Sequence, residues 1–373
     1  MQIIYPYNEN LPSQTAHDAY IFANCQSLTV EECAVTLVCG GGSQSDESLF
    51  KYYEAKSTSG FQIQRLPLIR RMKPCSISWN RPYSFLSQRY IKQCNPAIVI
   101  CSVRKQAAYL FSRKLPQIRY VYEVHELEWY PNQALPQNKK AWNRERKMLE
   151  AADLVTVTTE ALKTILLNPP YSLRSRIEVV PLAANTNLLP PPPTTAHPLN
   201  LTYVGQLYQG QGLELLLLAL SKVEDITLDV IGGKQCEIVK LKEHAKELGI
   251  KNRVVFHGFC APECLAPLVQ RGHVFVAPFD ITGRMPFVAH TKLLEYARWG
   301  RPIIAPKLTI VEELFPDGKG VELFQGGNAQ SLAETLEKTK KNLTQLQKEI
   351  SVQTDNFSWK QRAQRYVKIL KDL

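Results

Sequence analysis

The hydrophobic residues of this chain occur in short continuous runs rather than in strict alternation with polar residues. Such runs occupy positions 2–5, 35–39, 97–101 and 154–157 in the first half, and 201–204, 227–231 and 274–277 in the second. Short apolar runs bounded by turn residues predict strands buried on both faces, which is typical of parallel sheets covered by helices. Further strands are expected at 62–66, 120–124, 177–180, 254–256 and 303–305, and the polar segment 6–13 is expected to be a loop.

Segments of helical composition separate these strands, at 14–28, 83–94, 107–114, 138–151, 159–167 and 213–221. Strand, loop, helix and strand in that order form a βαβ unit. The sequence therefore predicts an α/β fold with two successive series of βαβ units.

A run of four prolines, Pro190 to Pro193, lies between the two series. Consecutive prolines adopt extended polyproline geometry and cannot enter a sheet interior, so this segment is the best candidate for a linker. We expect a first domain at 1–188, a linker at 189–198, a second domain at 199–352 and a final segment at 353–373. Apolar residues recur at helical spacing after Ser358, which predicts a C-terminal amphipathic helix.

The chemistry is concentrated in the stretch AHTKLLEYARWGRPIIAP, residues 289–306. Thr291 is a plausible N-cap of a short helix that Gly300 can end, and a buried strand follows. The backbone amides around Lys292, Leu293 and Leu294 would then form a cradle for a phosphate at the positive end of the helix dipole. Glu295, one turn further, can accept ribose hydroxyls; the alternative is a surface ion pair with Arg298.

The run KLLEYARWGRPIIA within this stretch resembles the donor-nucleotide motif of the retaining glycosyltransferases of family 4, and the likeness extends over nearly the whole chain. The resemblance implies a GT-B fold, in which two Rossmann-like domains face each other across a cleft and the C-terminal helix crosses back to the first domain. It implies a nucleotide-sugar donor held mainly by the second domain, with Lys292 and Glu295 at the reacting centre. It also implies front-face transfer with retention, with neither a metal nor another cofactor.

Two departures from the family pattern concern the donor, one at its diphosphate and one at its sugar. Where relatives read G-R-L-x-x-x-K-G, this chain has Gly205, Gln206 and Gln211, so both cations are replaced by glutamine. Lys292 and Arg284 are the candidate replacements. Phe287 stands where relatives often carry an acid, for which Asp280 is a possible substitute. Gly258 ends another strand whose loop is expected to converge on the same crevice.

On the first domain, His125 follows a predicted strand and resembles the family's strand-end histidine, which implies a hydrogen bond to the transferred sugar. Ser13, Thr15 and His17 stand where relatives contact the acceptor. Helix capping by the segment around His17 is the simpler alternative.

Net charge is +11, and its distribution is uneven. Residues 61–119 contain no acid and twelve cations, at positions 65, 70, 71, 73, 81, 89, 92, 104, 105, 113, 114 and 119. This block predicts a positive face on the first domain, suited to an anionic or lipid-linked acceptor and to an anionic membrane surface, or else a solvated surface with no partner. No nucleic-acid-binding motif accompanies it.

Nine scattered cysteines show no zinc spacing and are expected to be free thiols. Neither a secretion signal nor a membrane-spanning run is recognisable, which predicts a soluble cytosolic protein, peripheral on a membrane if its acceptor is a lipid.

Other functions remain open at this stage. A nucleotide-sugar epimerase would share the fold but needs acids or a base that the motif does not supply, and a catalytically weak nucleotide-sugar-binding protein would fit Gln206, Gln211 and Phe287. A dinucleotide oxidoreductase lacks its G-x-G-x-x-G fingerprint here.

Overall fold

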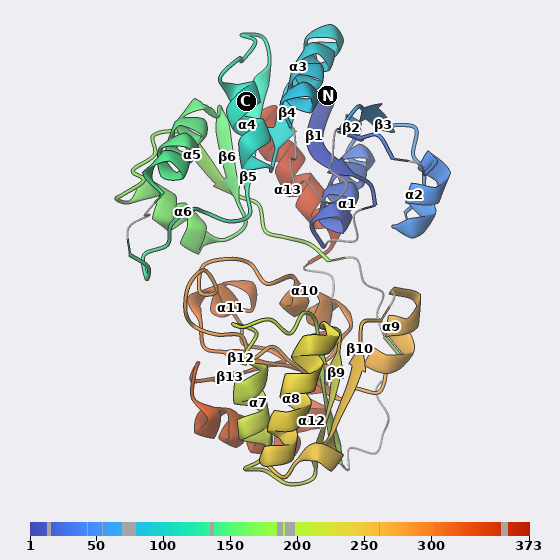
Figure 1. Cartoon of the computed structure of the whole chain (residues 1–373), viewed down its shortest axis with the longest axis vertical. Coiled ribbons are helices and arrows are strands. Elements are labelled where there is room, and N and C mark those ends of the chain that lie inside the picture. Colours follow the sequence, from blue (N-terminus) through green and yellow to red (C-terminus); the bar gives the residue numbers. More distant parts are fainter. Residues whose placement is uncertain are drawn as a thin grey trace. The chain divides into compact units, whose positions relative to one another are not determined.

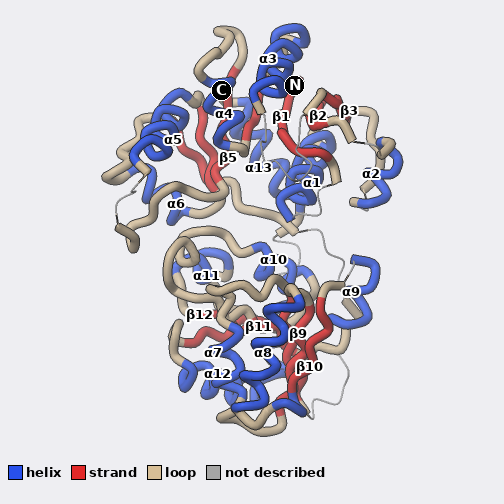
Figure 2. Tube along the Cα trace, in the orientation of Figure 1, coloured by secondary structure: helices blue, strands red, loops and turns tan. Residues whose placement is uncertain are grey.

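The computed structural model describes residues 1–12, 16–42, 44–53, 55–68, 80–134, 138–184, 189–190, 198–260, 262–351 and 357–373. The chain divides into two compact units, the first made of Met1–Pro181 and Trp359–Leu373 and the second of Leu182–Ser358 (Figure 1). In each unit helices pack on a parallel sheet (Figure 2). The predicted α/β fold with two Rossmann-like units is confirmed, and the last helix belongs to the first unit. Most of the predicted linker, 191–197, lies outside the described residues.

The first unit has seven parallel strands in the order β3-β2-β1-β4-β5-β6-β7. β1 lies inside the sheet, with Ile3 opposite Val35 on one side and Ile98 on the other. The strands are β1 (Gln2–Asn10), β2 (Ala34–Gly40), β3 (Phe61–Leu66), β4 (Ile98–Cys101), β5 (Arg119–Val124), β6 (Leu154–Val157) and β7 (Arg176–Val179). The helices are α1 (Ala16–Val30), α2 (Asp46–Tyr52), α3 (Arg81–Cys94), α4 (Arg104–Phe111), α5 (Lys139–Ala151), α6 (Glu160–Leu167) and α13 (Trp359–Lys371).

β1 is longer than the sequence predicts, because it continues through residues that were expected to form a loop. Pro6 pairs with Val38 of β2, whereas β4 pairs with β1 only at Ile3 and Ile4. A proline is tolerated here because this end of β1 has a neighbour on one side only. The next residue, Tyr7, is buried, which favours continuation of the strand.

The helices of the first unit form two layers. α1 and α13 are in contact with each other, and α4 contacts both α3 and α5. Parallel crossovers are right-handed, and the chain moves along the sheet in opposite directions through α1 and through α3, α4 and α5. The two groups therefore cover opposite faces of the sheet.

The second unit has six parallel strands in the order β10-β9-β8-β11-β12-β13, with Leu201 opposite Leu228 on one side and Val274 on the other. Its strands are β8 (Leu199–Val204), β9 (Ile226–Ile231), β10 (Val254–Gly258), β11 (Val274–Val276), β12 (Ile303–Pro306) and β13 (Val321–Phe324). Its helices are α7 (Leu213–Leu220), α8 (Gln235–Glu247), the 3-10 turn η1 (Lys251–Arg253), α9 (Pro262–Val269), α10 (Thr291–Arg298), α11 (Thr309–Leu314) and α12 (Ala329–Ser351).

A buried ion pair fastens α13 to the first unit. Arg362 of α13 and Glu123 of β5 are 4% and 2% exposed, and their side chains are paired. Arg362 also donates to the carbonyl oxygen of Val180 at 2.7 Å, and Glu123 accepts hydrogen bonds from Tyr5, at 2.9 Å, and from Tyr20. Burial acts to raise the pKa of Glu123, but Arg362 and these hydroxyls outweigh it and hold the pKa below its ordinary value.

Replacing Arg362 with alanine is expected to destabilise the protein by about 3–5 kcal/mol, because it leaves the Glu123 carboxylate buried without its partner. The measurement is the urea-induced unfolding transition at pH 7. The matched control is Arg365→Ala, which removes an exposed arginine from the same helix and should cost no more than about 0.5 kcal/mol. Equal losses in the two variants would contradict the structural role of the ion pair.

Candidate functional site

In the second unit, the start of α10 lies beside the end of β8, at the point where the strand order reverses between β8 and β11. A Cβ on Gly205, directly after β8, would come within 3.3 Å of the Lys292 ammonium. The predicted N-cap is wrong: His290 caps the helix with extended backbone angles, and Thr291 is the first helical residue. Gly300 ends the helix at φ 70, as predicted. Ligands of parallel sheets bind at such switch points.

Lys292 is held by two neutral acceptors rather than by an acid. Its Nζ donates to the Tyr203 hydroxyl at 2.9 Å and to the Oε1 of Gln211 at 2.5 Å, and it lies 4.3 Å from the centre of the Tyr203 ring. Gln211 is buried at 6% exposure. Burial lowers the pKa of Lys292 to about 7, although Glu295 acts in the opposite direction. The ammonium is therefore poorly solvated and incompletely compensated.

Glu295 lies one turn further along α10 and is partly buried. Burial raises the pKa of its carboxyl to about 7, and Lys292 offsets part of that rise. Within the described part of the chain, no hydrogen bond or ion pair joins the Glu295 side chain to another residue, so the alternative pair with Arg298 is not formed. The carboxylate remains available to hydroxyl groups of a ligand.

The loop 205–212 is fixed by close backbone packing. Gly212 has φ 75, and a Cβ there would lie 1.8 Å from the Pro278 carbonyl oxygen, so only glycine fits. The amide of Asp280 donates to the carbonyl oxygen of Gly210 at 2.8 Å. Gln206 is exposed, and its carbonyl oxygen accepts a hydrogen bond from Tyr203 at 2.6 Å. These contacts hold the loop after β8 against the loop after β11.

The other residues predicted to bind the donor, Gly258, Asp280 and Arg284, differ in which of their groups can reach a ligand. Gly258 ends β10, and its carbonyl oxygen accepts from Gly232 at 2.7 Å. The Asp280 carboxylate is bound to its own loop, at Ile281 and Thr282, whereas Arg284 has an exposed side chain.

The predicted phosphate cradle requires a correction. The side chains of Leu293 and Leu294 are fully buried, so these residues can offer only their backbone amides. The amide of Leu293 already donates to the His290 carbonyl oxygen at 3.0 Å. His290 itself stacks on Phe279 at 3.8 Å between ring centres and hydrogen-bonds the Met285 carbonyl oxygen at 2.8 Å. The cradle therefore has one donor fewer, and the helix start is anchored by a histidine that the sequence analysis missed.

In the first unit, the structure brings together two of the predicted residues. His125 follows β5 and His17 lies in the first turn of α1, and their rings meet edge to face at 5.3 Å between centres. Tyr20 contacts His125 at 4.8 Å, and Tyr7 contacts His17 at 5.4 Å. Ser13 and Thr15 lie outside the described residues.

Both histidines favour the neutral form at pH 7. Burial lowers the pKa of His125 to about 4, and it also lowers the pKa of His17. The Nε2 atom of His125 is buried and has no hydrogen-bond partner in the described structure. A neutral imidazole with a free nitrogen is suited to a hydrogen bond with a sugar hydroxyl rather than to charge stabilisation.

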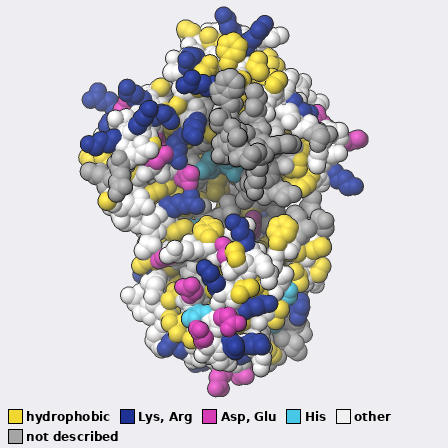
Figure 3. Space-filling view, viewed as in Figure 1, with side chains coloured by type: hydrophobic (Ala, Val, Ile, Leu, Met, Phe, Trp, Pro, Cys, Tyr) yellow, Lys and Arg dark blue, Asp and Glu magenta, His cyan; other side chains and the backbone are white. Residues whose placement is uncertain are grey.

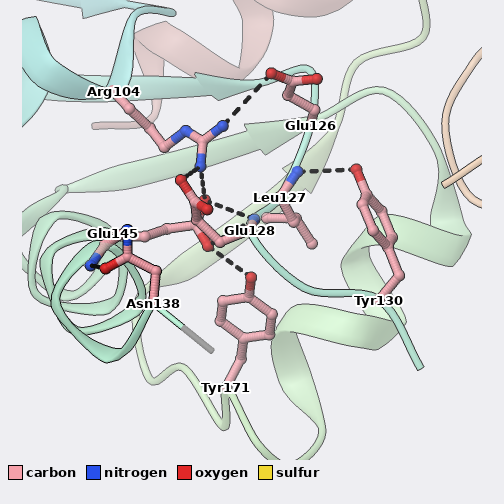
Figure 4. Close-up of polar contacts among 9 residues, drawn as sticks. Arg104, Glu126, Leu127, Glu128, Tyr130, Asn138, Glu145 and Tyr171 are labelled. Atoms are coloured by element: carbon pink, nitrogen blue, oxygen red, sulfur yellow. Dashed lines mark hydrogen bonds and ion pairs between the residues drawn. The ribbon is translucent and has the colours of Figure 1, made fainter. Parts of the chain in front are cut away.

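The loop that follows His125 is held by a network of acids around Arg104 (Figure 4). Arg104 pairs with Glu126 at 3.4 Å, with Glu145 at 3.3 Å, and with Glu128. The buried Glu145 accepts the amide of Glu128 at 3.0 Å and the Tyr171 hydroxyl at 2.6 Å. These contacts fix the backbone directly after His125.

This network and Tyr203 carried no local signal in the sequence. Arg104 and Glu145 are far apart in the chain, and Tyr203 lies within an ordinary apolar strand. Of the two residues that accept hydrogen bonds from Lys292, only Gln211 was singled out from the sequence, as a position that lacks the expected cation.

Three cations of the basic block are neutralised by acids outside it. Arg65 pairs with Asp46, Lys114 with Asp153 at 2.6 Å, and Arg104 with the glutamates above. Arg70, Arg71 and Lys73 lie outside the described residues. The other six are exposed and form no ion pair with a described residue: Arg81, Arg89, Lys92, Lys105, Arg113 and Arg119.

Among the described residues, no group of three or more metal-ligating side chains comes together. No helix in the same part of the chain is both long and apolar enough to span a membrane.

Comparison with known proteins gives matches for both units. A family model described as Glycosyltransferase Family 4 matches residues 19–188, and one described as Glycosyl transferases group 1 matches residues 198–342. A search of curated proteins gave no match.

Solved structures with the same fold include three that match the chain over its full length. Sucrose-phosphate synthase from Thermosynechococcus elongatus aligns at TM-score 0.79 and 16% identity, covering 100% of this chain and 98% of its own. Anabaena Alr3699/HepE in complex with UDP aligns at 0.77 and 15%, covering 100% of both chains. The lipopolysaccharide outer core galactosyltransferase WaaB aligns at 0.72 and 15%, also covering 100% of both.

Proposed function

Because this chain belongs to the family 4 and group 1 glycosyltransferases of GT-B fold, we propose that it moves a hexosyl group from a nucleotide sugar to an acceptor hydroxyl with retention of anomeric configuration. The observation that carries the proposal is the pair of Lys292 and Glu295 on α10. Both charges are partly buried and neither meets an opposite charge in an ion pair among the described residues, so a ligand with complementary groups would satisfy both.

The second unit binds the donor. The diphosphate lies at the start of α10, against Lys292, Thr291 and the free amides of that turn, and Arg284 adds a charge from the neighbouring loop. Glu295 accepts hydroxyls of the ribose. Gly205 and Gly258 present backbone without side chains at the strand ends. The structures of Anabaena Alr3699/HepE with UDP and with UDP-glucose support a nucleotide sugar as the class of donor.

The reaction needs few reacting side chains. The bond between the anomeric carbon and the diphosphate oxygen breaks, the acceptor oxygen forms its bond to the same face of that carbon, and the acceptor proton passes to the departing phosphate. Lys292 stabilises the charge that grows on the leaving group. His125 donates a hydrogen bond to a hydroxyl of the transferred sugar and holds it in place.

The acceptor binds to the first unit, near His17. The six exposed, unpaired cations of the basic block support an acceptor that is anionic or lipid-linked. The protein then works on the cytosolic face of a membrane, to which it binds peripherally.

Glu295→Ala should weaken binding of UDP or of the preferred nucleotide sugar by about 10-fold to 100-fold, because hydrogen bonds to a charged acceptor contribute roughly 1.5–3 kcal/mol. A panel of nucleotide sugars is screened by thermal stabilisation, and affinities are then measured by calorimetry. Glu214→Ala, which removes an exposed glutamate from α7, is the matched control. Unchanged affinity in Glu295→Ala would show that this motif does not bind the donor.

Binding of the nucleoside diphosphate should weaken as the pH rises above about 7. The pKa of Lys292 is about 7 in the free protein, and a bound diphosphate raises it, so binding takes up a proton. Above about pH 7.5, where most Glu295 carboxyls are ionised, affinity should fall by up to about tenfold per pH unit as Lys292 loses its proton. Lys292→Arg keeps its charge throughout and should abolish the dependence between pH 7.5 and 9. The same slope in both proteins would refute the assignment.

His125→Ala should lower the rate of sugar transfer by about tenfold, the contribution of one neutral hydrogen bond, and leave UDP affinity unchanged. The rate is followed as nucleoside diphosphate release, and the configuration of the product is read by proton NMR. Equal losses of rate and UDP affinity would exclude a contact with the sugar, and an inverted product would exclude retention.

A catalytically weak nucleotide-sugar-binding protein is the second candidate. It is favoured by Gln211, whose neutral side chain occupies one hydrogen-bond position of Lys292 that a phosphate would otherwise use. Tight binding of a nucleotide sugar with no release of nucleoside diphosphate, in the presence of any acceptor, would select this function.

A further inference from the structure

A groove of about 650 Å³ lies between α4 and α5 in the helix layer of the first unit that also contains α3, and no predicted site residue lines it. Its floor is apolar, made by Phe111 and Ala108 of α4 and Met148 and Ala151 of α5. Phe111 and Met148 are buried, at 3% exposure each, so the Phe111 ring and the Met148 side chain do not protrude into the groove.

The rim of this groove is strongly basic. Lys139, Lys140, Arg144 and Lys147 line it from α5, and all four are exposed. Lys and Arg side chains gather over this part of the first unit, at the upper left of Figure 3. None of them forms an ion pair with a described residue. The two acids of α5 are engaged elsewhere, because Glu145 belongs to the Arg104 network and Glu150 pairs with Arg146 at 3.4 Å. The rim therefore carries uncompensated charge.

The combination of apolar and basic side chains extends beyond the groove to the neighbouring helix α3. α3, which contacts α4, exposes Arg81, Phe85, Arg89 and Lys92 along one side, and Phe85 is 58% exposed. These positions recur at helical spacing and combine one large apolar side chain with three cations. Neither α3 nor α4 contains an acid. This helix layer thus joins apolar and cationic groups on one surface.

We propose that the groove between α4 and α5 binds an anionic phospholipid and that this contact holds the first unit on a membrane. The lipid phosphate pairs with Lys140 and Arg144, and the upper part of an acyl chain lies on the apolar floor, where Ala108 and Ala151 are partly exposed. A cationic rim above an apolar floor is complementary to an amphiphile. Nucleic acid fits less well, because the ring in the groove is buried and offers no face for a base.

This proposal deepens the membrane part of the proposed function and does not depend on sugar transfer. It also differs from the sequence prediction in location, because α5 follows the basic block of residues 61–119. The cations that line the groove come from residues that the block did not include.

The test is co-sedimentation of the full chain with vesicles of phosphatidylcholine containing increasing phosphatidylglycerol, at low and high salt. Binding should rise with phosphatidylglycerol and fall with salt. Lys140→Glu with Arg144→Glu should weaken it by at least about tenfold. The matched control, Lys240→Glu with Lys242→Glu, reverses two exposed lysines of α8 in the second unit and should bind as the wild type.

Ala108→Arg separates a groove site from diffuse attraction. The variant adds a positive charge but fills the groove, so vesicle binding should fall several-fold although net charge rises. Thermal melting and UDP affinity, measured on every variant, should match the wild type and thus distinguish failure of this site from failure of the donor site.

Three results would overturn the proposal. They are undiminished binding by Ala108→Arg, no binding to any vesicle at low salt, and tighter binding to a single-stranded RNA than to anionic vesicles. The last would identify nucleic acid as the occupant.

Discussion

The strand order of each sheet constrains where a ligand can bind. All strands of a parallel sheet end at the same edge, and β1 and β8 each have neighbours whose crossover helices leave on opposite faces. The connecting loops must separate at that point, and backbone groups and side chains there lack neighbours from the sheet. Lys292 and Gln211 meet at the switch point of the second unit, and His17 follows the corresponding strand of the first.

The two units use buried charge in opposite ways. Glu123 and Arg362 are almost fully buried, but each is hydrogen-bonded by several groups, so the pair stays ionised and binds α13 to the unit. Lys292 and Glu295 are only partly buried and incompletely compensated, and burial shifts both pKa values toward neutrality. The first arrangement stabilises the fold. In the second, the buried charges of Lys292 and Glu295 are incompletely stabilised, and a ligand with complementary groups would stabilise them.

Gln211 links the loop 205–212 to Lys292 of α10. Its amide oxygen holds the Lys292 ammonium at 2.5 Å and shares this place with Tyr203. A lysine at this position would bring a second ammonium against the first unless it turned away. The neutral residue therefore orients Lys292, and the single charge of Lys292 becomes sensitive to its surroundings.

The sequence alone determined the features that depend on local chemistry. Continuous apolar runs located every strand except β13, and the spacing of Lys292, Glu295 and Gly300 identified the helix that carries the candidate donor site. Predictions from the local sequence were wrong where strand pairing or the choice of N-cap residue set the bounds of an element. Pro6 stayed in β1 because only one side of it is paired, and His290 took the N-cap position expected of Thr291.

Only the tertiary structure decided which charges are free. Residues 61–119 contain no acid, yet Arg104 is neutralised by glutamates of later segments, and the exposed lysines of α5 extend the basic surface beyond that block. Ion pairs and grooves form between residues distant in the chain, such as Glu123 and Arg362, which are 239 positions apart. Periodicity and spacing report the conformation of a segment, but the partner of a charge is selected by the packing of whole helices and strands.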